Sequence, residues 1–198
     1  MKKQKTNCLF SRKFMHMTLT KQNRILGIAL IALAAGMKVI TFPHSINPII
    51  AISLFSGAII NDKRWAFFLP IMAMFASDLM LEIFSIAPGF YGIGQIGNYA
   101  SLLFVTLLGF SLKKPSILSV TGFSVASSLL FFFLSNTNCY FFDFAGFYGK
   151  GITGWLACLT AGLPFLRNGM LIDLMFSGML FTAYHFLFSA TRQTVKSI

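Results

Sequence analysis

One stretch of the chain, Trp65 to Phe84, is apolar enough to cross a bilayer and yet carries two acidic residues, Asp78 and, one helical turn later, Glu82. An ionisable group at membrane depth is energetically costly, and it usually faces the interior of the protein or a water-filled cavity. Asp78 is therefore a candidate functional residue, and the other apolar stretches can be placed around it.

The composition indicates a membrane protein. Hydrophobic residues make up 56% of the 198 residues and charged residues only 11%, whereas a soluble domain contains about 25% charged residues. The net charge of +11 would also suit a nucleic-acid-binding protein. However, the basic residues stand in short clusters between apolar runs, which is typical of cytoplasmic loops. We therefore expect the lipid bilayer, and no nucleic acid, as a partner.

The apolar runs predict an all-α membrane protein, a bundle of six transmembrane helices with a partly helical external loop between helices five and six. That loop contains an apolar segment, 152–163, whose length is more typical of an interfacial or re-entrant helix than of a span. The second run is short for a span unless it begins near Ile46. The six predicted spans are residues 25–40, 49–60, 65–84, 96–112, 117–134 and 168–189.

The domain organisation follows from these spans. Residues 25–190 form the predicted transmembrane domain, preceded by a basic cytoplasmic tail (1–24) and followed by a short cytoplasmic tail (191–198). The first run could instead be a cleavable signal segment, because small residues at 34–36 would suit a cleavage site. Apolar character resumes beyond Lys38, and this favours a retained helix.

The distribution of basic residues predicts the orientation. With six spans, most of the sixteen Lys and Arg lie on one side, in the first tail, the loops 61–64 and 113–114, and the last tail. Cytoplasmic loops carry an excess of Lys and Arg. We therefore expect a multi-pass protein of the cell inner (plasma) membrane with both termini in the cytoplasm.

Polar side chains of several spans are predicted to lie at one level in the outer half of the membrane. Asp78 lies about 20 Å from the cytoplasmic start of its span, and Asp173 lies about 9 Å below the external start of the sixth. Lys38 lies at a depth similar to that of Asp78. The sequence thus predicts a ligand-binding pocket that opens outward, with polar contacts from His44, Asn47, Asp78, Asn136, Asn138 and Asp173.

Each of these residues also has a simpler interpretation. Lys38 could extend its amine to the membrane interface, Asp78 could pair with Lys38 and only fix the helix register, and Asp173 could cap the last helix. Glu82 could face water outside, and His185 is expected to be a packed or interfacial histidine. Aromatic residues near the mouth could form an interfacial belt or the apolar walls of a ligand site: Tyr140, Phe144, Phe147, Tyr148 and Trp155.

Small residues and cysteines suggest packing rather than chemistry. Ala32 with Gly36, and Ser53 with Gly57, give two of the spans faces on which a neighbouring helix can pack closely. The three cysteines, Cys8, Cys139 and Cys158, have no metal-binding spacing. Cys139 and Cys158 could form a disulfide on an oxidising side, but free buried thiols are the favoured interpretation.

The sequence contains none of the common enzyme motifs. It has no Gly-rich phosphate-binding loop ending in Lys-Ser/Thr and no HExxH or paired-cysteine metal site. Gly122–Ser124 does not complete the GxSG turn of a rhomboid protease, and neither intramembrane aspartate has the setting of an aspartyl protease. We therefore predict a protein that is not an enzyme and that has no catalytic residues, cofactor or metal site.

Several short motifs, taken together, resemble a known family. The motifs are ProHisSerIleAsnPro (43–48), AsnAspLysArgTrpAlaPhe (61–67) with Pro70, SerAsp (77–78), SerAsn (135–136), and GlyLeuProPhe (162–165) with Asn168 and Asp173. They resemble a family of small uncharacterised bacterial membrane proteins that is similar to the substrate-binding S components of energy-coupling-factor (ECF) vitamin transporters. The resemblance covers most of the chain, from about residue 38 to residue 187.

This resemblance implies a six-helix bundle that binds a small vitamin-like solute from outside. A transmembrane coupling subunit and two ATPases would supply the energy, with Ala32 and Gly36 as the docking face. Two other function classes remain open. The protein could be a stand-alone ion- or proton-coupled carrier that uses Asp78 and Asp173 as protonation sites, or a membrane scaffold that binds only other proteins. The sequence does not name the ligand.

Overall fold

The computed structural model describes residues 25–42, 46–143 and 146–196, the side chains of 187–196 excepted. These residues form six helices and no strand, so the predicted all-α class is confirmed. The predictions made for the tail 1–24, Cys8, His44 and Phe144 lie outside the described residues. The helices are the N-terminal helix Ile25–Ile40, α2 Ile49–Ile59, α3 Lys63–Ile83, α4 Gly94–Gly109, α5 Ile117–Phe141 and α6 Gly151–Lys196.

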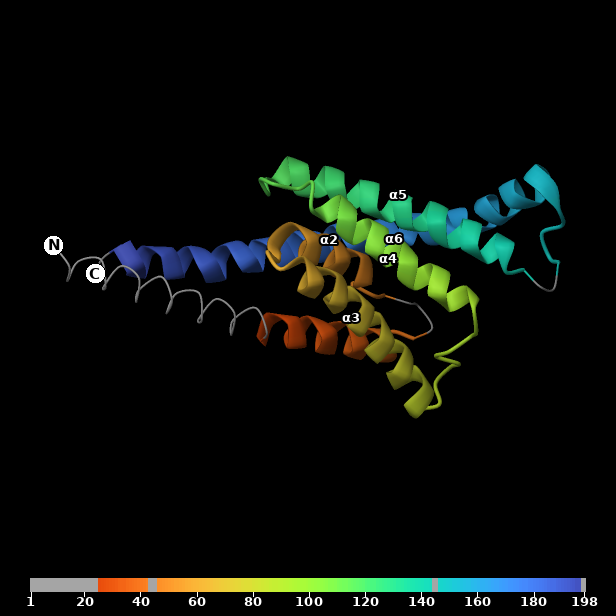
Figure 1. Cartoon of the computed structure of the whole chain (residues 1–198), viewed down its shortest axis with the longest axis horizontal. Helices are drawn as coiled ribbons and strands as arrows, with labels where there is room; N and C mark the ends of the chain where they lie inside the picture. The colour runs from red at the N-terminus through yellow and green to blue at the C-terminus, as the bar shows by residue number, and fades with distance from the viewer. Residues whose placement is uncertain (1–24, 43–45, 144–145, 197–198) are drawn as a thin grey trace.

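The helices run alternately up and down, so their connections gather at two ends (Figure 1). At one end lie the α2–α3 and α4–α5 connections, with Lys63, Arg64, Lys113 and Lys114. We call it the basic end. The α3–α4 and α5–α6 connections lie at the opposite end, and α6 returns from there and projects past the other helices at the basic end. The arrangement separates the exposed lysines at 113 and 114 from the loops of the other end.

Within the described part of the chain, three helices are long and apolar enough to cross a membrane: α3, α5 and the part of α6 from Gly151 to Phe186. They carry many exposed large apolar side chains, such as Phe68, Ile117 and Phe165. A water-soluble protein rarely exposes so much apolar surface. The structure therefore supports a helical membrane protein.

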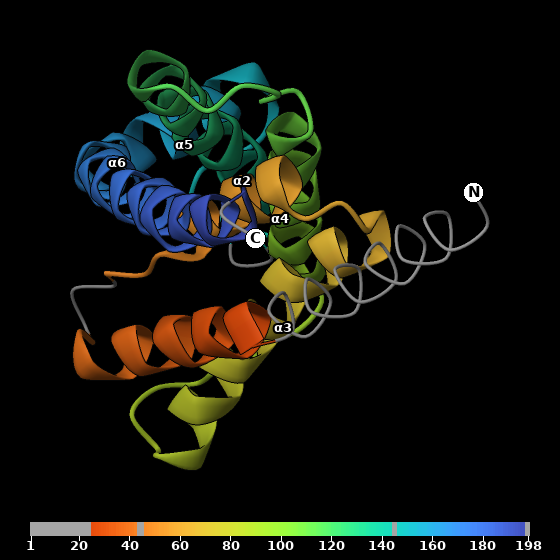
Figure 2. The same cartoon turned by 90° about the vertical axis from the view of Figure 1, so that its left-hand side faces the viewer.

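Helix α2 lies in the centre of the fold. It has only eleven residues, eight of them buried, and a helix of that length is about 17 Å long, roughly half the thickness of the bilayer core. Both views place α2 and α4 between the N-terminal helix and α3 on one side and α5 and α6 on the other (Figures 1 and 2). A short helix that is apolar on all sides belongs in a protein core, and α2 lies in the core of this fold.

Two glycines let α2 and α4 cross at close range. A Cβ on Gly57 would lie 3.0 Å from Gly109 Cα and would clash with Thr106 O, and a Cβ on Gly109 would lie 2.6 Å from Leu54 O. The predicted close packing at Gly57 is therefore confirmed. Gly36 differs, because nothing lies within 4 Å of a Cβ placed there, so the small-residue face of the N-terminal helix has no neighbour at this position.

The predicted loop between helices five and six was wrong. Helix α5 continues past Leu134 to Phe141, and residues 152–163 are the first turns of α6, which runs on through Pro164. Contacts with α5 explain the difference, because Trp155 Nε1 donates to Thr137 Oγ1 at 3.1 Å and Cys158 Sγ donates to the Asn136 carbonyl at 3.3 Å. These tertiary contacts hold in helical form a segment that is too short to span the membrane.

Candidate functional site

Two aspartates are almost completely buried. The exposed fraction is 1% for Asp78 on α3 and 2% for Asp173 on α6. Burying a carboxylate away from water is costly unless it is paired and hydrogen-bonded. The partners of each aspartate therefore indicate what each one does.

Asp78 is fully engaged by other parts of the chain. Lys38, on the N-terminal helix, forms a salt bridge with Asp78 Oδ1. On α4, Gln95 Nε2 and Tyr99 Oη donate to Asp78 Oδ2 at 2.7 and 2.8 Å. The predicted pairing with Lys38 is confirmed. Sequence reasoning missed Gln95 and Tyr99, although their spacing of four residues placed both on one face of α4. We call these four residues the Asp78 cluster.

The α3–α4 connection closes over the Asp78 cluster. Gly89 passes so near α3 that a Cβ on it would lie 2.8 Å from Asp78 C and would clash with Asp78 O. The Gly89 N–H donates to Glu82 Oε2 at 2.7 Å, and Gln95 Nε2 donates to Gly89 O at 3.1 Å. In the same connection, partial burial raises the pKa of Tyr91 above its ordinary value of 10.0. Glu82, expected to face water, is exposed and also anchors the connection.

Asp173 has much less support. Ser128 Oγ on α5 donates to Asp173 Oδ2 at 2.7 Å, and among the described residues this is the only hydrogen bond to the Asp173 carboxylate. Asp173 lies 22 residues after the start of α6 at Gly151, or about 33 Å along the helix. Because the helix begins earlier than expected, Asp173 lies in its interior, and the predicted capping role is wrong.

A cavity of about 170 Å³ lies beside Asp173. We call it the Asp173 cavity. Its polar side chains are Asp173, Ser128, Ser135 and Asn136, and the others are apolar apart from one glycine. The full lining comes from α2, α5 and α6: Ile50, Ser128, Phe131, Phe132, Ser135, Asn136, Phe165, Leu166, Gly169, Met170 and Asp173.

The described predicted site residues do not gather in one place. Asn136 and Asp173 both line the Asp173 cavity, whereas Asn138 Nδ2 donates to Gly94 O on α4 at 2.6 Å and Asp78 lies in its own cluster. Asn47 has a buried Oδ1 with no partner among the described residues. Asn47 precedes α2 and lies three residues before Ile50, which lines the cavity.

The aromatic residues proposed as pocket walls lie elsewhere. Tyr140 Oη donates to Gly151 O at 3.1 Å, Trp155 bonds Thr137, and Phe147 is exposed. Neither these three nor Tyr148 lines the Asp173 cavity. Cys139 and Cys158 are free, the first exposed and the second buried, so the expected burial holds for Cys158 alone.

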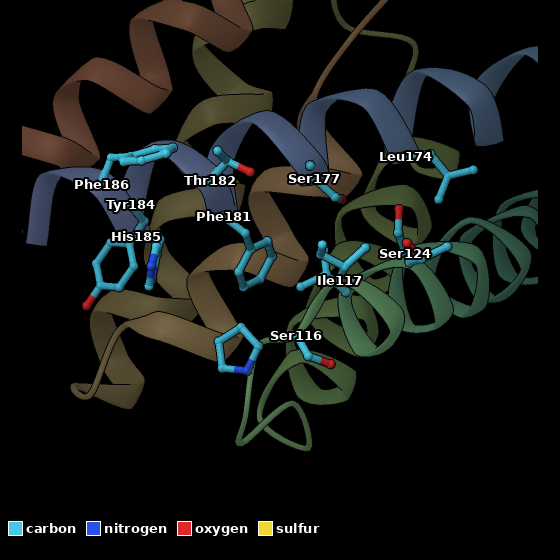
Figure 3. A pocket seen from close by; sticks show the side chains of 14 residues that line it. Ser116, Ile117, Ser124, Leu174, Ser177, Phe181, Thr182, Tyr184, His185 and Phe186 are labelled. Carbon is cyan, nitrogen blue, oxygen red and sulfur yellow. The ribbon is translucent and has the colours of Figure 1, made fainter. Parts of the chain in front are cut away.

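A larger hollow of about 730 Å³ lies between α5 and α6 near the basic end (Figure 3). We call it the basic-end groove. His185, expected to be packed or interfacial, lines it. No acidic residue does. The sequence analysis did not predict this groove, although hydroxyl residues recur along α5 on its side. The lining is Pro115, Ser116, Ile117, Val120, Thr121, Ser124, Leu174, Ser177, Gly178, Phe181, Thr182, Tyr184, His185 and Phe186.

The chain belongs to a family without an assigned function. The model of the family of unknown function DUF6580 matches residues 18–196, nearly the whole chain. No curated protein and no solved structure matches the chain.

Proposed function

We propose that this member of the DUF6580 family is an integral inner-membrane protein that binds a small solute in the Asp173 cavity. It would serve as the substrate-binding subunit of an uptake system and would have no ATPase of its own. One observation carries the proposal. Asp173 is buried beside a cavity and has a single hydrogen-bond donor among the described residues.

The chemistry of a carboxylate explains why this observation points to a ligand. An ionised carboxylate has about four lone-pair positions, and Ser128 occupies one of them. A buried carboxylate left in this state must pair with a cation, accept further hydrogen bonds or carry a proton. A solute with an ammonium, amide or hydroxyl donor would meet this requirement, and Asn136 and Ser135 add polar contacts on the same wall.

The position of the cavity suits a solute that enters from outside. If the basic end is cytoplasmic, as the positive-inside rule implies, Ser128 and Asn136 lie about 17 and 29 Å along α5 from that side. The cavity then lies in the middle and outer parts of the membrane.

The resemblance to ECF S components supports a vitamin-like solute and a coupling subunit with ATPases as partners. The volume of the cavity restricts this idea. About 170 Å³ holds about five or six water molecules, and ligand sites for drug-sized molecules are usually larger than about 300 Å³. A vitamin-sized solute would therefore insert one polar end, or it would displace the side chains of Phe131, Phe132 and Phe165 that line the cavity.

A second candidate function is supported by the same carboxylate. A stand-alone carrier coupled to protons or cations needs an intramembrane acid that is not already neutralised by the protein. Asp173 meets that description and Asp78 does not, because Lys38 pairs with Asp78. Such a carrier would move solute in liposomes without any ATPase, whereas a substrate-binding subunit would bind solute and not transport it.

Native mass spectrometry of the gently solubilised protein tests the proposal. We expect a small molecule to co-purify with the wild type and to be absent from Asp173→Asn. Ser127→Ala is the matched control, because Ser127 is also buried on α5 but does not line the cavity. A small molecule that stays bound to Asp173→Asn would contradict the assignment of the site.

A further inference from the structure

The seam between α5 and α6 contains both hollows. The two helices are antiparallel and are joined by the bonds Trp155–Thr137, Cys158–Asn136 and Ser128–Asp173. Towards the basic end, the Asp173 cavity ends at Ser128 and Asp173. The basic-end groove begins at Ser124 and Leu174. About one helical turn separates the two linings on α5, whereas on α6 they meet at the consecutive residues Asp173 and Leu174.

The layer between the hollows consists of small polar side chains. Ser128 Oγ donates to Asp173 and also lies 3.1 Å from the Ser124 carbonyl oxygen. Ser124 and Ser177 are each 1% exposed, and their hydroxyls have no hydrogen-bond partner among the described residues. Figure 3 shows both side chains in the space between α5 and α6.

Hydroxyls in this state indicate a missing partner. Buried polar groups in folded proteins are nearly always hydrogen-bonded to protein or to ordered water. Both serines line the basic-end groove, but their hydroxyl oxygens are buried, so the layer must open before water or a passing solute in the groove can supply their partners. The layer is also thin, because serine side chains are small.

The groove is wide enough to hold water, and several polar side chains stand among its mostly apolar lining. Its volume of about 730 Å³ corresponds to roughly 24 water molecules. Beyond the two serines, Ser116, Thr121, Thr182 and His185 provide donors and acceptors along its length. The lining begins at Pro115, directly after exposed Lys113 and Lys114. The groove therefore reaches the level where the chain meets water and lipid headgroups.

We propose that the α5–α6 seam is a path from the Asp173 cavity to the basic end, of which the basic-end groove is the water-filled inner half. The Ser128–Asp173 hydrogen bond, with Ser124 and Ser177 below it, forms the closed layer between the two halves. This inference rests on the proposed solute site at Asp173. It adds the route by which a solute or proton leaves that site towards the cytoplasm.

Cysteine labelling in membrane vesicles tests the path. In full-length protein with Cys8, Cys139 and Cys158 replaced by serine, single variants Thr121→Cys, Ser124→Cys and Ser177→Cys are treated with a charged, membrane-impermeant thiosulfonate. We expect all three to be labelled when the reagent is on the side of the basic end and to be unlabelled when it is on the other side. Ser127→Cys, which is buried on α5 but lines neither hollow, should remain unlabelled.

The outcomes separate the alternatives. Labelling only by a neutral, lipid-soluble maleimide would mean that lipid fills the groove, and no labelling by either reagent would mean that packed protein fills it. Each of these results overturns the path. Leu129→Cys, on an exposed apolar position of α5 that lines neither hollow, confirms that the maleimide reaches the membrane. Because labelling does not depend on a bound solute, a failure of the Asp173 site in native mass spectrometry would be seen separately.

Discussion

The two buried aspartates differ in what the protein provides for them. Asp78 receives a salt bridge from Lys38 and hydrogen bonds from Gln95 and Tyr99, so three helices meet at its carboxylate. Asp173 receives one hydrogen bond from a serine and faces a cavity. The difference teaches that burial of an acid does not by itself mark a functional site. The degree to which the fold neutralises the acid is the better guide.

Their positions in the fold fit this division. The Asp78 cluster joins the N-terminal helix, α3 and α4, and the α3–α4 connection covers it. The Asp173 cavity is lined by residues of α2, α5 and α6, and α5 and α6 lie on the other side of α2 from α3 (Figure 2). We therefore interpret the first region as structural and the second as functional, and the predictions below test that interpretation.

The largest effect is expected for Asp78→Ala. Removing one partner of a buried ion pair leaves an uncompensated charge and typically costs about 3–5 kcal/mol. We expect a loss of thermal stability in detergent of that order, which the double change Lys38→Met with Asp78→Leu should largely restore. If Asp78→Ala instead unfolded like the wild type but lost a bound solute, Asp78 would be a ligand contact and the comparison would be reversed.

A smaller loss of stability is expected for Gly89→Ala. A Cβ there would clash with the backbone of Asp78, and overpacking of this kind costs about 1–3 kcal/mol. Gly122→Ala is the matched control, because nothing lies within 4 Å of a Cβ on Gly122 and alanine favours a helix interior by up to about 1 kcal/mol. Thermal unfolding that ranks the two variants equally would argue against a tightly closed cover over Asp78.

The sequence alone was sufficient to predict the local features of this fold. Apolar length and composition predicted the helical segment Ile25–Ile40 and the all-α class. They also predicted the Lys38–Asp78 pair as one alternative. Each of these depends on the composition of a single segment or on two charges of opposite sign within apolar surroundings, both of which can be read along the chain.

The sequence alone was not sufficient to predict features that depend on tertiary contacts. Gln95 and Tyr99 lie 17 and 21 residues beyond Asp78, and nothing in their local pattern indicates which acid they bind. The start of α6 at Gly151 depends on the contact of Trp155 with α5. Because that start was misplaced, Asp173 was expected near the beginning of its helix, and the basic-end groove was not predicted.

A still smaller effect on stability is expected for Ser128→Ala. The net contribution of one hydrogen bond is about 1 kcal/mol, and the loss leaves Asp173 without its one described donor. We expect a modest decrease in stability together with weaker retention of the bound solute in native mass spectrometry. Ser127→Ala, with no bond to break among the described residues, should retain the solute. Equal solute loss in both variants would indicate a general effect of α5 packing.

The smallest effect on stability, with the largest effect on function, is expected for Asp173→Asn. The substitution keeps the size of the side chain and an oxygen that can still accept the Ser128 hydrogen bond, so unfolding should change by no more than about 1 kcal/mol, the net contribution of one hydrogen bond. Solute binding, or proton-coupled uptake in liposomes, should be lost because Asp173 is the acidic residue that lines the cavity. Uptake by the wild-type protein without ATPases would favour the carrier. Binding without uptake would favour the substrate-binding subunit. A variant that unfolds readily and still binds solute would show that Asp173, like Asp78, is a structural acid.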